Sequence, residues 1–146
     1  MTKNYKKFYF NVIDHLKEKY RQKPFPYKDK TMIKKLGLVN KQCKEYNDNW
    51  YYQKHHIIEI DVSGATLKND KERNNNELAI VCNIEEHAFL HYLIVCNQST
   101  KPNHGFLLMM NLEQWDNAVK KLCQEYNVPY DKDWKTKLTC YKAIQK

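Results

Sequence analysis

The chain has 146 residues, the size of one ordinary domain, and 42% of them are hydrophobic, which is enough for a core and excludes a wholly disordered chain. Its 25 basic and 17 acidic residues leave a formal net charge of +8. This excess favours a polyanionic partner, although many lysine-rich proteins that bind no nucleic acid share it.

Apolar runs in the sequence are far shorter than a bilayer crossing requires, and no basic N-terminal stretch leads into an apolar one. We therefore expect a cytoplasmic protein with no membrane partner. The five cysteines are scattered, odd in number and without a CxxC pair, so neither a disulfide framework nor a cysteine zinc site is indicated.

Hydrophobic periodicity and capping patterns predict an α+β protein. Asn83 followed by Glu86 is typical of a capping box at a helix start, and Asn111 with Gln114 repeats that pattern. In chain order, the first expected elements are a helix over 4–22 that ends before Pro24 and a weak helix over 31–47 that is interrupted at Gly37. A strand through 50–52 and 56–60, a long polar loop over 63–76, a strand over 78–82 and a helix over 84–97 follow. The last elements are a turn over 99–105, a helix from 112 that Pro129 ends, and an amphipathic segment over 133–144.

Four of the six histidines form two pairs, His55 with His56 on the first strand and His87 with His91 on the central helix. Adjacent strand residues point to opposite faces, so one of the first pair can bind a metal ion while the other stays free as a base. Residues four apart on a helix share a face, so the second pair can bind one ion. Each pair alone is more often accidental than functional, but the order of His-His, polar loop, short strand and capped HxxxH helix is rarely accidental.

The stretches 52–58 (YQKHHII) and 85–93 (EEHAFLHYL) resemble HNH endonucleases, particularly phage-type homing endonucleases, and their histidine pattern is similar to that of the colicin nuclease domains. The resemblance implies a ββα-metal (His-Me finger) core over 50–98. Residues 1–49 would form an N-terminal helical region and 99–146 a C-terminal helical extension, all in one domain. A phage-encoded protein would act in the host cytoplasm.

The resemblance also implies roles for individual residues. His55, His87 and His91 would hold one divalent ion, and His56 would be the general base. The motif asparagine would fall on Leu78 without a gap, so Asn76 is the candidate to orient His56, through its side-chain carbonyl or through the backbone nearby. The family's proline and following basic residue are Glu59 and Ile60 here, and these departures put activity in question more than fold.

Imidazole ligands suit zinc, nickel, cobalt or manganese better than magnesium. The basic side chains nearest to the motif are expected to contact backbone phosphates. Carboxylates that follow the motif could extend the metal shell, but the favoured expectation is that they are exposed loop residues. The phosphate-contacting candidates are Lys54, Lys68, Lys71 and Arg73, and the carboxylates are Glu59 and Asp61.

The first functional hypothesis is a metal-dependent endonuclease that hydrolyses phosphodiester bonds in double-stranded DNA. The alternative is a catalytically weakened HNH scaffold that binds DNA or a protein partner as a regulator or inhibitor. An HNH toxin is a third, less favoured hypothesis. The sequence leaves open the target site, the working ion, the oligomeric state, and whether the protein nicks or cuts both strands.

Overall fold

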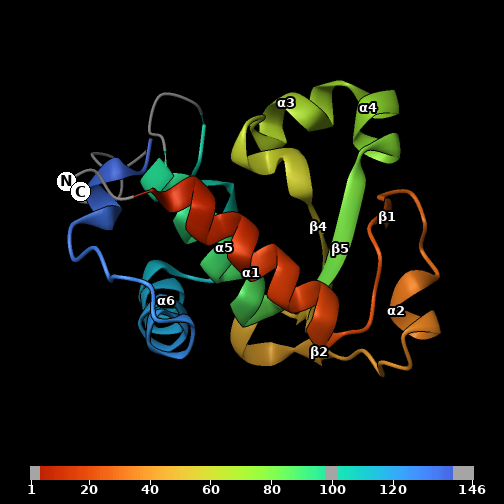
Figure 1. Cartoon of the computed structure of the whole chain (residues 1–146), viewed down its shortest axis with the longest axis horizontal. Helices are drawn as coiled ribbons and strands as arrows, with labels where there is room; N and C mark the ends of the chain where they lie inside the picture. Colours follow the sequence, from red (N-terminus) through yellow and green to blue (C-terminus); the bar gives the residue numbers. More distant parts are fainter. Residues whose placement is uncertain (1–3, 98–101, 140–146) are drawn as a thin grey trace.

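The structure is a computed structural model that describes residues 4–97 and 102–139. Small antiparallel sheets and three longer helices build an α+β fold (Figure 1). The α-helices are α1 (Tyr5–Lys19), α2 (Met32–Lys35), α3 (Gly64–Asn69), α4 (Lys71–Asn76), α5 (Ile84–Asn97) and α6 (Leu112–Tyr126). The strands are β1 (Phe25–Pro26), β2 (Gln42–Cys43), β3 (Asn49–Trp50), β4 (Tyr52–His56) and β5 (Leu78–Asn83), and 3₁₀ turns cover η1 (Lys44–Tyr46), η2 (Ile57–Ile60), η3 (Gly105–Leu108) and η4 (Trp134–Lys137).

Strand β5 is the centre of the main sheet, with β4 antiparallel on one side and β1 antiparallel on the other. In this register His55 stands opposite Ile80, and His56 stands opposite Ala79. Helix α5 begins directly after β5, as the sequence patterns predicted for the second strand and the central helix, whereas η2, α3 and α4 lie between β4 and β5. Strands β2 and β3 form a separate two-stranded ribbon.

Helix α5 is almost entirely buried, because apolar residues occupy its whole circumference and need cover on every side. Helix α1 packs Tyr9, Val12 and Leu16 into the same core, and α6 contributes Trp115. The indole Nε1 of Trp115 donates a hydrogen bond to the carbonyl oxygen of Ala88, at 2.8 Å. In Figure 1, α1 crosses in front of α5, and α6 lies on the side away from α2.

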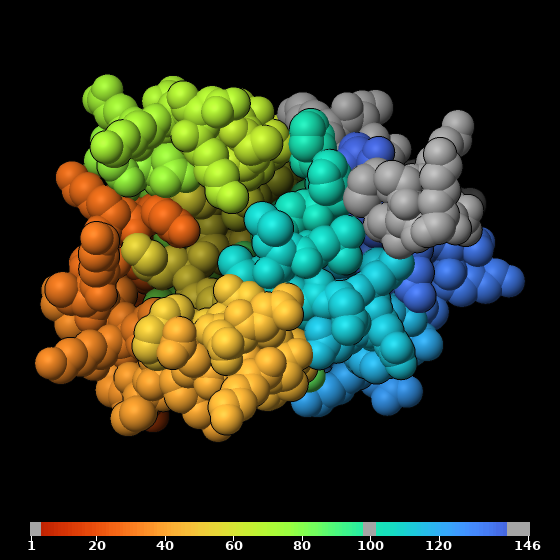
Figure 2. Space-filling view, turned by 180° about the vertical axis from the view of Figure 1, so that it is seen from behind, coloured from red at the N-terminus to blue at the C-terminus, as the bar shows by residue number. Residues whose placement is uncertain are grey.

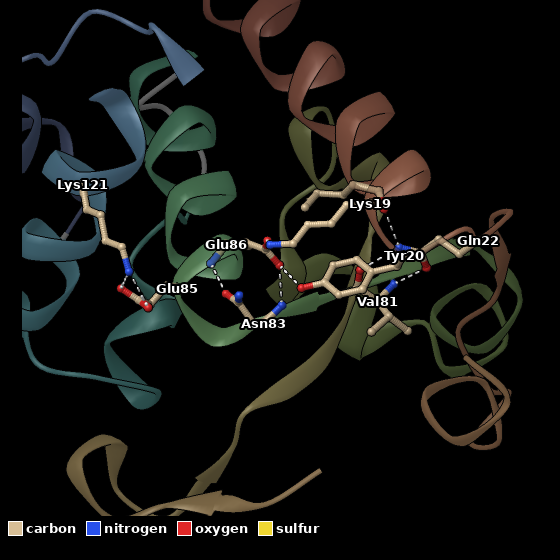
Figure 3. Close-up of polar contacts among 9 residues, drawn as sticks. Lys19, Tyr20, Gln22, Val81, Asn83, Glu85, Glu86 and Lys121 are labelled. Atoms are coloured by element: carbon tan, nitrogen blue, oxygen red, sulfur yellow. Dashed lines mark hydrogen bonds and ion pairs between the residues drawn. The ribbon is translucent and has the colours of Figure 1, made fainter. Parts of the chain in front are cut away.

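The start of α5 is fixed by the predicted capping box. The Asn83 side-chain oxygen accepts a hydrogen bond from the Glu86 backbone N–H at 2.8 Å, and the Glu86 carboxylate accepts one from the Asn83 N–H at 2.7 Å (Figure 3). The buried carboxylate of Glu86 also accepts hydrogen bonds from Lys19 at 2.5 Å and from the Tyr20 hydroxyl at 2.7 Å. The end of α1 is thus tied to the first turn of α5.

A second tie joins the segment after α1 to the sheet. The buried side-chain amide of Gln22 exchanges two hydrogen bonds with the backbone of Val81, each 2.8 Å long (Figure 3). These satisfied polar groups hold α1 against β5 as well as α5.

The polar segment 63–76 was expected to be a loop, and this prediction is wrong. It folds into α3 and α4, each with a side-chain N-cap: Ser63 accepts from Thr66 N at 3.2 Å, and Asp70 accepts from Arg73 N at 3.1 Å. Only Leu67 of these two helices is buried. Local capping rather than hydrophobic periodicity therefore organises this segment, which is why a search for an apolar stripe missed it.

Other expectations hold in part. The helices at the N-terminus, over 84–97 and after Asn111 are confirmed, but the weak helix over 31–47 shrinks to α2. The described part of the last predicted segment contains only the 3₁₀ turn η4; its residues 140–144 lie outside the described part, as do residues 99–101 of the predicted turn. The four described cysteines are buried free thiols, and no helix of the described residues could span a membrane.

Candidate metal centre

Three histidines and one carboxylate converge where β4, η2 and α5 meet. The rings of His55 and His87 are 5.1 Å apart between centroids, those of His55 and His91 are 5.2 Å apart, and those of His87 and His91 are 4.8 Å apart. Glu59 completes the group, and one donor atom from each of the four residues lies within 4.8 Å of the others. The three predicted ligands are therefore brought together from segments more than 30 residues apart.

Local geometry explains the convergence. His87 and His91 are one helical turn apart on α5 and face the same side. His55 and His56 are neighbours on β4, so their side chains point to opposite faces of the sheet, and it is His55 that faces α5. The expected strand over 56–60 does not continue past His56, because Ile57–Ile60 forms a 3₁₀ turn that brings Glu59 back beside His55.

The hydrogen bonds of Tyr9 define the tautomer of His55. The single Tyr9 hydroxyl proton is donated to the carbonyl oxygen of Ile57 at 2.8 Å, so the 2.7 Å contact between that hydroxyl and His55 Nε2 requires the proton to be on the imidazole. Neutral His55 then has a bare Nδ1. This atom is buried and has no hydrogen-bond partner in the described protein, and it faces the cluster. A buried ring nitrogen whose lone pair accepts no hydrogen bond calls for an explanation, and binding of a metal ion would provide one.

Gln53 has the same role for His87. Its side-chain amide nitrogen donates to the carbonyl oxygen of Trp50 at 2.9 Å, which leaves the amide oxygen facing His87. That oxygen accepts the Nδ1 proton of His87 at 2.5 Å and leaves Nε2 bare. Outer-shell partners of this kind orient metal-binding imidazoles in proteins. Sequence reasoning had not singled out Tyr9 or Gln53, because nothing in their spacing reveals such a contact.

Glu59 corrects a sequence-based expectation. It was expected to be an exposed loop carboxylate, but its side chain is only 11% exposed, and its Oε2 lies 3.2 Å from His55 Nδ1 and 4.0 Å from His91 Nε2. Asp61, the other carboxylate considered, is half-exposed and pairs with Lys6 at 2.8 Å. The signal that could have identified Glu59 is its position four residues after His55, but only the 3₁₀ turn gives that spacing its meaning.

Electrostatics in the cluster reflect burial of ionisable groups. Burial lowers the pKa of His91 to about 4, and burial together with the neighbouring imidazoles lowers the pKa values of His55 and His87 well below the usual range. Burial also raises the pKa of Glu59 to about 8. The imidazoles are therefore neutral at physiological pH, which is the form that binds metal ions.

His56 lies on the opposite face of β4 from the cluster. Its ring stacks on Tyr27 with centroids 3.8 Å apart, and its Nε2 is 2.7 Å from the backbone oxygen of Asn74. Because a carbonyl only accepts, Nε2 carries the proton and Nδ1 of the neutral ring is bare. Burial lowers the pKa of His56, opposed by the hydrogen bond with Asn74. The role assigned to the Asn76 side chain is thus filled by the backbone of Asn74; Asn76 instead lines a separate hollow with Arg73 and Glu77.

A pocket of about 280 Å³ opens beside both features, and His56, Glu59, His87 and His91 all line it. Figure 2 shows the hollow between the orange, amber, yellow-green and cyan parts of the surface, which come from widely separated segments. Other lining residues include Tyr27, Asn74, His104 and Phe106.

The four predicted phosphate-contacting residues do not behave alike. Lys54 and Lys68 line the pocket, whereas Lys71 and Arg73 do not. The Lys54 ammonium also donates to the backbone oxygen of Tyr27 and lies 4.4 Å from the centre of that ring, and burial lowers its pKa. Arg73 pairs with Glu77 at 3.3 Å.

The donor set fits a divalent transition-metal ion. Three neutral imidazoles and a carboxylate are borderline ligands that suit zinc, manganese, cobalt or nickel, and the bare nitrogens of His55 and His87 are both available to an ion. Comparisons of the chain with protein-family models, with curated proteins and with solved structures found no match.

Proposed function

We propose that the chain is a metal-dependent HNH-type endonuclease that hydrolyses phosphodiester bonds in DNA, built on a ββα-metal core formed by β4, β5 and α5. One observation supports the proposal: a cluster that could hold a metal ion and a separate, oriented histidine line the same pocket, although His55 of the cluster and His56 point to opposite faces of one strand.

His56 is the general base of this proposal. The Asn74 carbonyl holds its Nε2 proton and the Tyr27 ring holds its plane, so the bare Nδ1 is presented as a proton acceptor. A positioned imidazole of this kind removes a proton from an attacking water molecule. His55, His87 and His91 would hold a divalent ion, which would supply positive charge to stabilise the phosphate and the departing oxygen. Lys68 on the pocket rim adds to the positive field around the phosphate.

The partner proposed is double-stranded DNA, and the positive charge beside the pocket supports it. Between residues 28 and 44 the chain has six lysines and a single acidic residue, Asp29. All six lysines are exposed, whereas Asp29 is engaged with the backbone and hydroxyl of Thr31. Tyr27 lines the pocket and is the first residue of this basic segment (residues 27–44). When the cleaved bond lies in the pocket, the neighbouring phosphates of the same DNA can therefore reach the lysines of the basic segment.

Plasmid nicking with added Mn²⁺, Co²⁺ or Ni²⁺ tests the function. We expect His56→Ala to lower the cleavage rate by about 10²- to 10⁴-fold, because it removes the base, and to bind metal as tightly as wild type. We expect His87→Ala to lose both cleavage and metal binding. His15→Ala, an exposed histidine of α1, is the matched control and should keep both.

Cleavage that survives His56→Ala would remove the assigned base. A wild-type protein that cuts no plasmid with any ion, but shifts DNA in a salt-sensitive gel assay, would instead support the alternative of a DNA-binding scaffold without nuclease activity.

A further inference from the structure

Glu59 is a buried carboxylate without a basic partner. No lysine or arginine in the described segments lies within ion-pair distance of it; the imidazoles of His55 and His91 and the backbone of His56 are its polar contacts, and Lys68 acts only from farther away. The ionised form of a carboxyl group buried away from any cation is costly, and a bound divalent cation would stabilise that form. A bound cation would therefore stabilise both the Glu59 carboxylate and the bare Nδ1 of His55.

The distances also place Glu59 among the ligands. Two atoms that bind one zinc ion at about 2.1 Å each lie roughly 3–4 Å apart. The distances from Glu59 Oε2 to His55 Nδ1, 3.2 Å, and to His91 Nε2, 4.0 Å, fall in this range. The four donor atoms together lie within 4.8 Å of one another, so side-chain adjustments of about 1 Å would bring the widest pair into this range as well.

Gly64, at the start of α3, leaves room for this carboxylate. A β-carbon at residue 64 would lie 2.8 Å from Glu59 Oε1, closer than any real contact of that kind. A side chain at this position would push the carboxylate away from its present place. The glycine at residue 64 thus accommodates the Glu59 carboxylate in its present position.

We propose that Glu59 is a fourth protein ligand and that it selects which ions support activity. Zinc prefers four ligands, so three histidines and Glu59 saturate it and leave no position for a phosphate. Manganese prefers six ligands and keeps open positions in the same site. Zinc then binds tightly but inhibits, and manganese is a working ion. This inference rests on the metal site of the proposed function, and its ion selectivity also rests on the nuclease reaction.

Zinc affinity, measured by competition with a chromogenic chelator, tests Glu59 as a ligand independently of catalysis. We expect Glu59→Ala and Glu59→Gln to weaken zinc binding by more than about 100-fold, because loss of a direct ligand should exceed the roughly 10- to 100-fold loss caused by removing an outer-shell contact. The visible absorption of bound Co²⁺, which is strong for four ligands and weak for six, should change in both variants. Asp61→Asn, a neighbouring exposed carboxylate, is the matched control and should change neither.

Gly64→Ala provides a second variant that keeps the carboxylate but displaces it, and it should weaken zinc in the same direction. Wild-type zinc affinity and Co²⁺ spectrum in folded Glu59→Ala would overturn the proposal. Plasmid nicking with zinc should rise above the wild-type rate in Glu59→Ala; an unchanged rate in an otherwise active enzyme would overturn the ion selectivity. If zinc affinity falls in the Glu59 variants but no ion supports DNA cleavage by any variant or by the wild type, the proposed nuclease activity is wrong, whereas the assignment of Glu59 as a metal ligand is supported.

Discussion

Individual residues around the cluster act by holding protons in place. Tyr9 and Gln53 each accept a ring proton from one histidine, and in doing so they leave the opposite ring nitrogen bare toward the centre of the cluster. Both contacts use side chains whose own orientation is fixed by a backbone carbonyl, from Ile57 and Trp50 respectively. An imidazole held in the correct tautomer loses less rotational freedom when it binds an ion.

We therefore expect Gln53→Ala and Tyr9→Phe each to weaken zinc binding by about 10- to 100-fold. The measurement is isothermal titration calorimetry, with circular dichroism to confirm that each variant is folded. Gln124→Ala, an exposed glutamine of α6, is the control and should bind zinc as wild type does. Unchanged affinity in both variants would show that the two hydrogen bonds do not position the ligands.

At the scale of elements, the site depends on how α5 begins. Asn83 ends β5 and caps α5, so one residue determines both the end of the strand and the start of the helix that carries His87 and His91. Helix α6 begins with an equivalent capping box, in which Asn111 Oδ1 accepts from Gln114 N at 2.8 Å, but it carries none of the proposed ligands. The two caps form a natural pair for separating stability from function.

Asn83→Ala and Asn111→Ala should each lower the free energy of unfolding by about 1 kcal/mol, the usual cost of losing an N-cap. Only Asn83→Ala should also weaken metal binding, because fraying of the first turn of α5 displaces His87. Urea unfolding of the metal-free protein and zinc titration give the two quantities. Equal zinc affinities for the two variants would mean that the cap contributes stability alone.

At the scale of the whole molecule, positive charge is unevenly distributed. The basic segment packs its partly buried apolar residues, among them Met32 and Leu36, against a small core of Phe25, Ala79 and Val81, and it lies beside the pocket through Tyr27. Figure 2 shows its orange surface along one side of the hollow. Helix α4 and its flanking residues, in contrast, balance Lys71 and Arg73 with Asp70, Glu72 and Glu77. We therefore expect the basic segment to contribute more of the contacts with DNA phosphates.

A double variant, Lys34→Ala with Lys35→Ala, should weaken DNA binding and reduce the slope of log K against log salt by about two, one for each lost phosphate contact. Zinc affinity should not change. Lys71→Ala with Arg73→Ala should change the salt slope less. The measurement is fluorescence anisotropy of a labelled duplex at several salt concentrations without divalent ions. A larger effect from the second pair would place the DNA along α4 instead.

Sequence reasoning could predict those parts of the fold that depend on neighbouring residues. The capping boxes, the apolar helix α5, and the shared face of His87 and His91 follow from spacings of three and four along the chain. The opposite orientation of His55 and His56 follows from strand alternation. The helices α3 and α4 were missed because polar residues with local caps resemble a loop when only hydrophobic periodicity is considered.

The sequence by itself determined the α+β class, the central helix and which histidines could act together, because these depend on short-range periodicity. Tertiary structure alone decided that Glu59 joins the histidines, that Tyr9 and Gln53 set their tautomers, and that Asn74 rather than Asn76 reaches His56. Those contacts join residues up to 46 positions apart, or depend on a 3₁₀ turn in place of a strand. Such distances are set by how packed elements meet, and no local pattern encodes them.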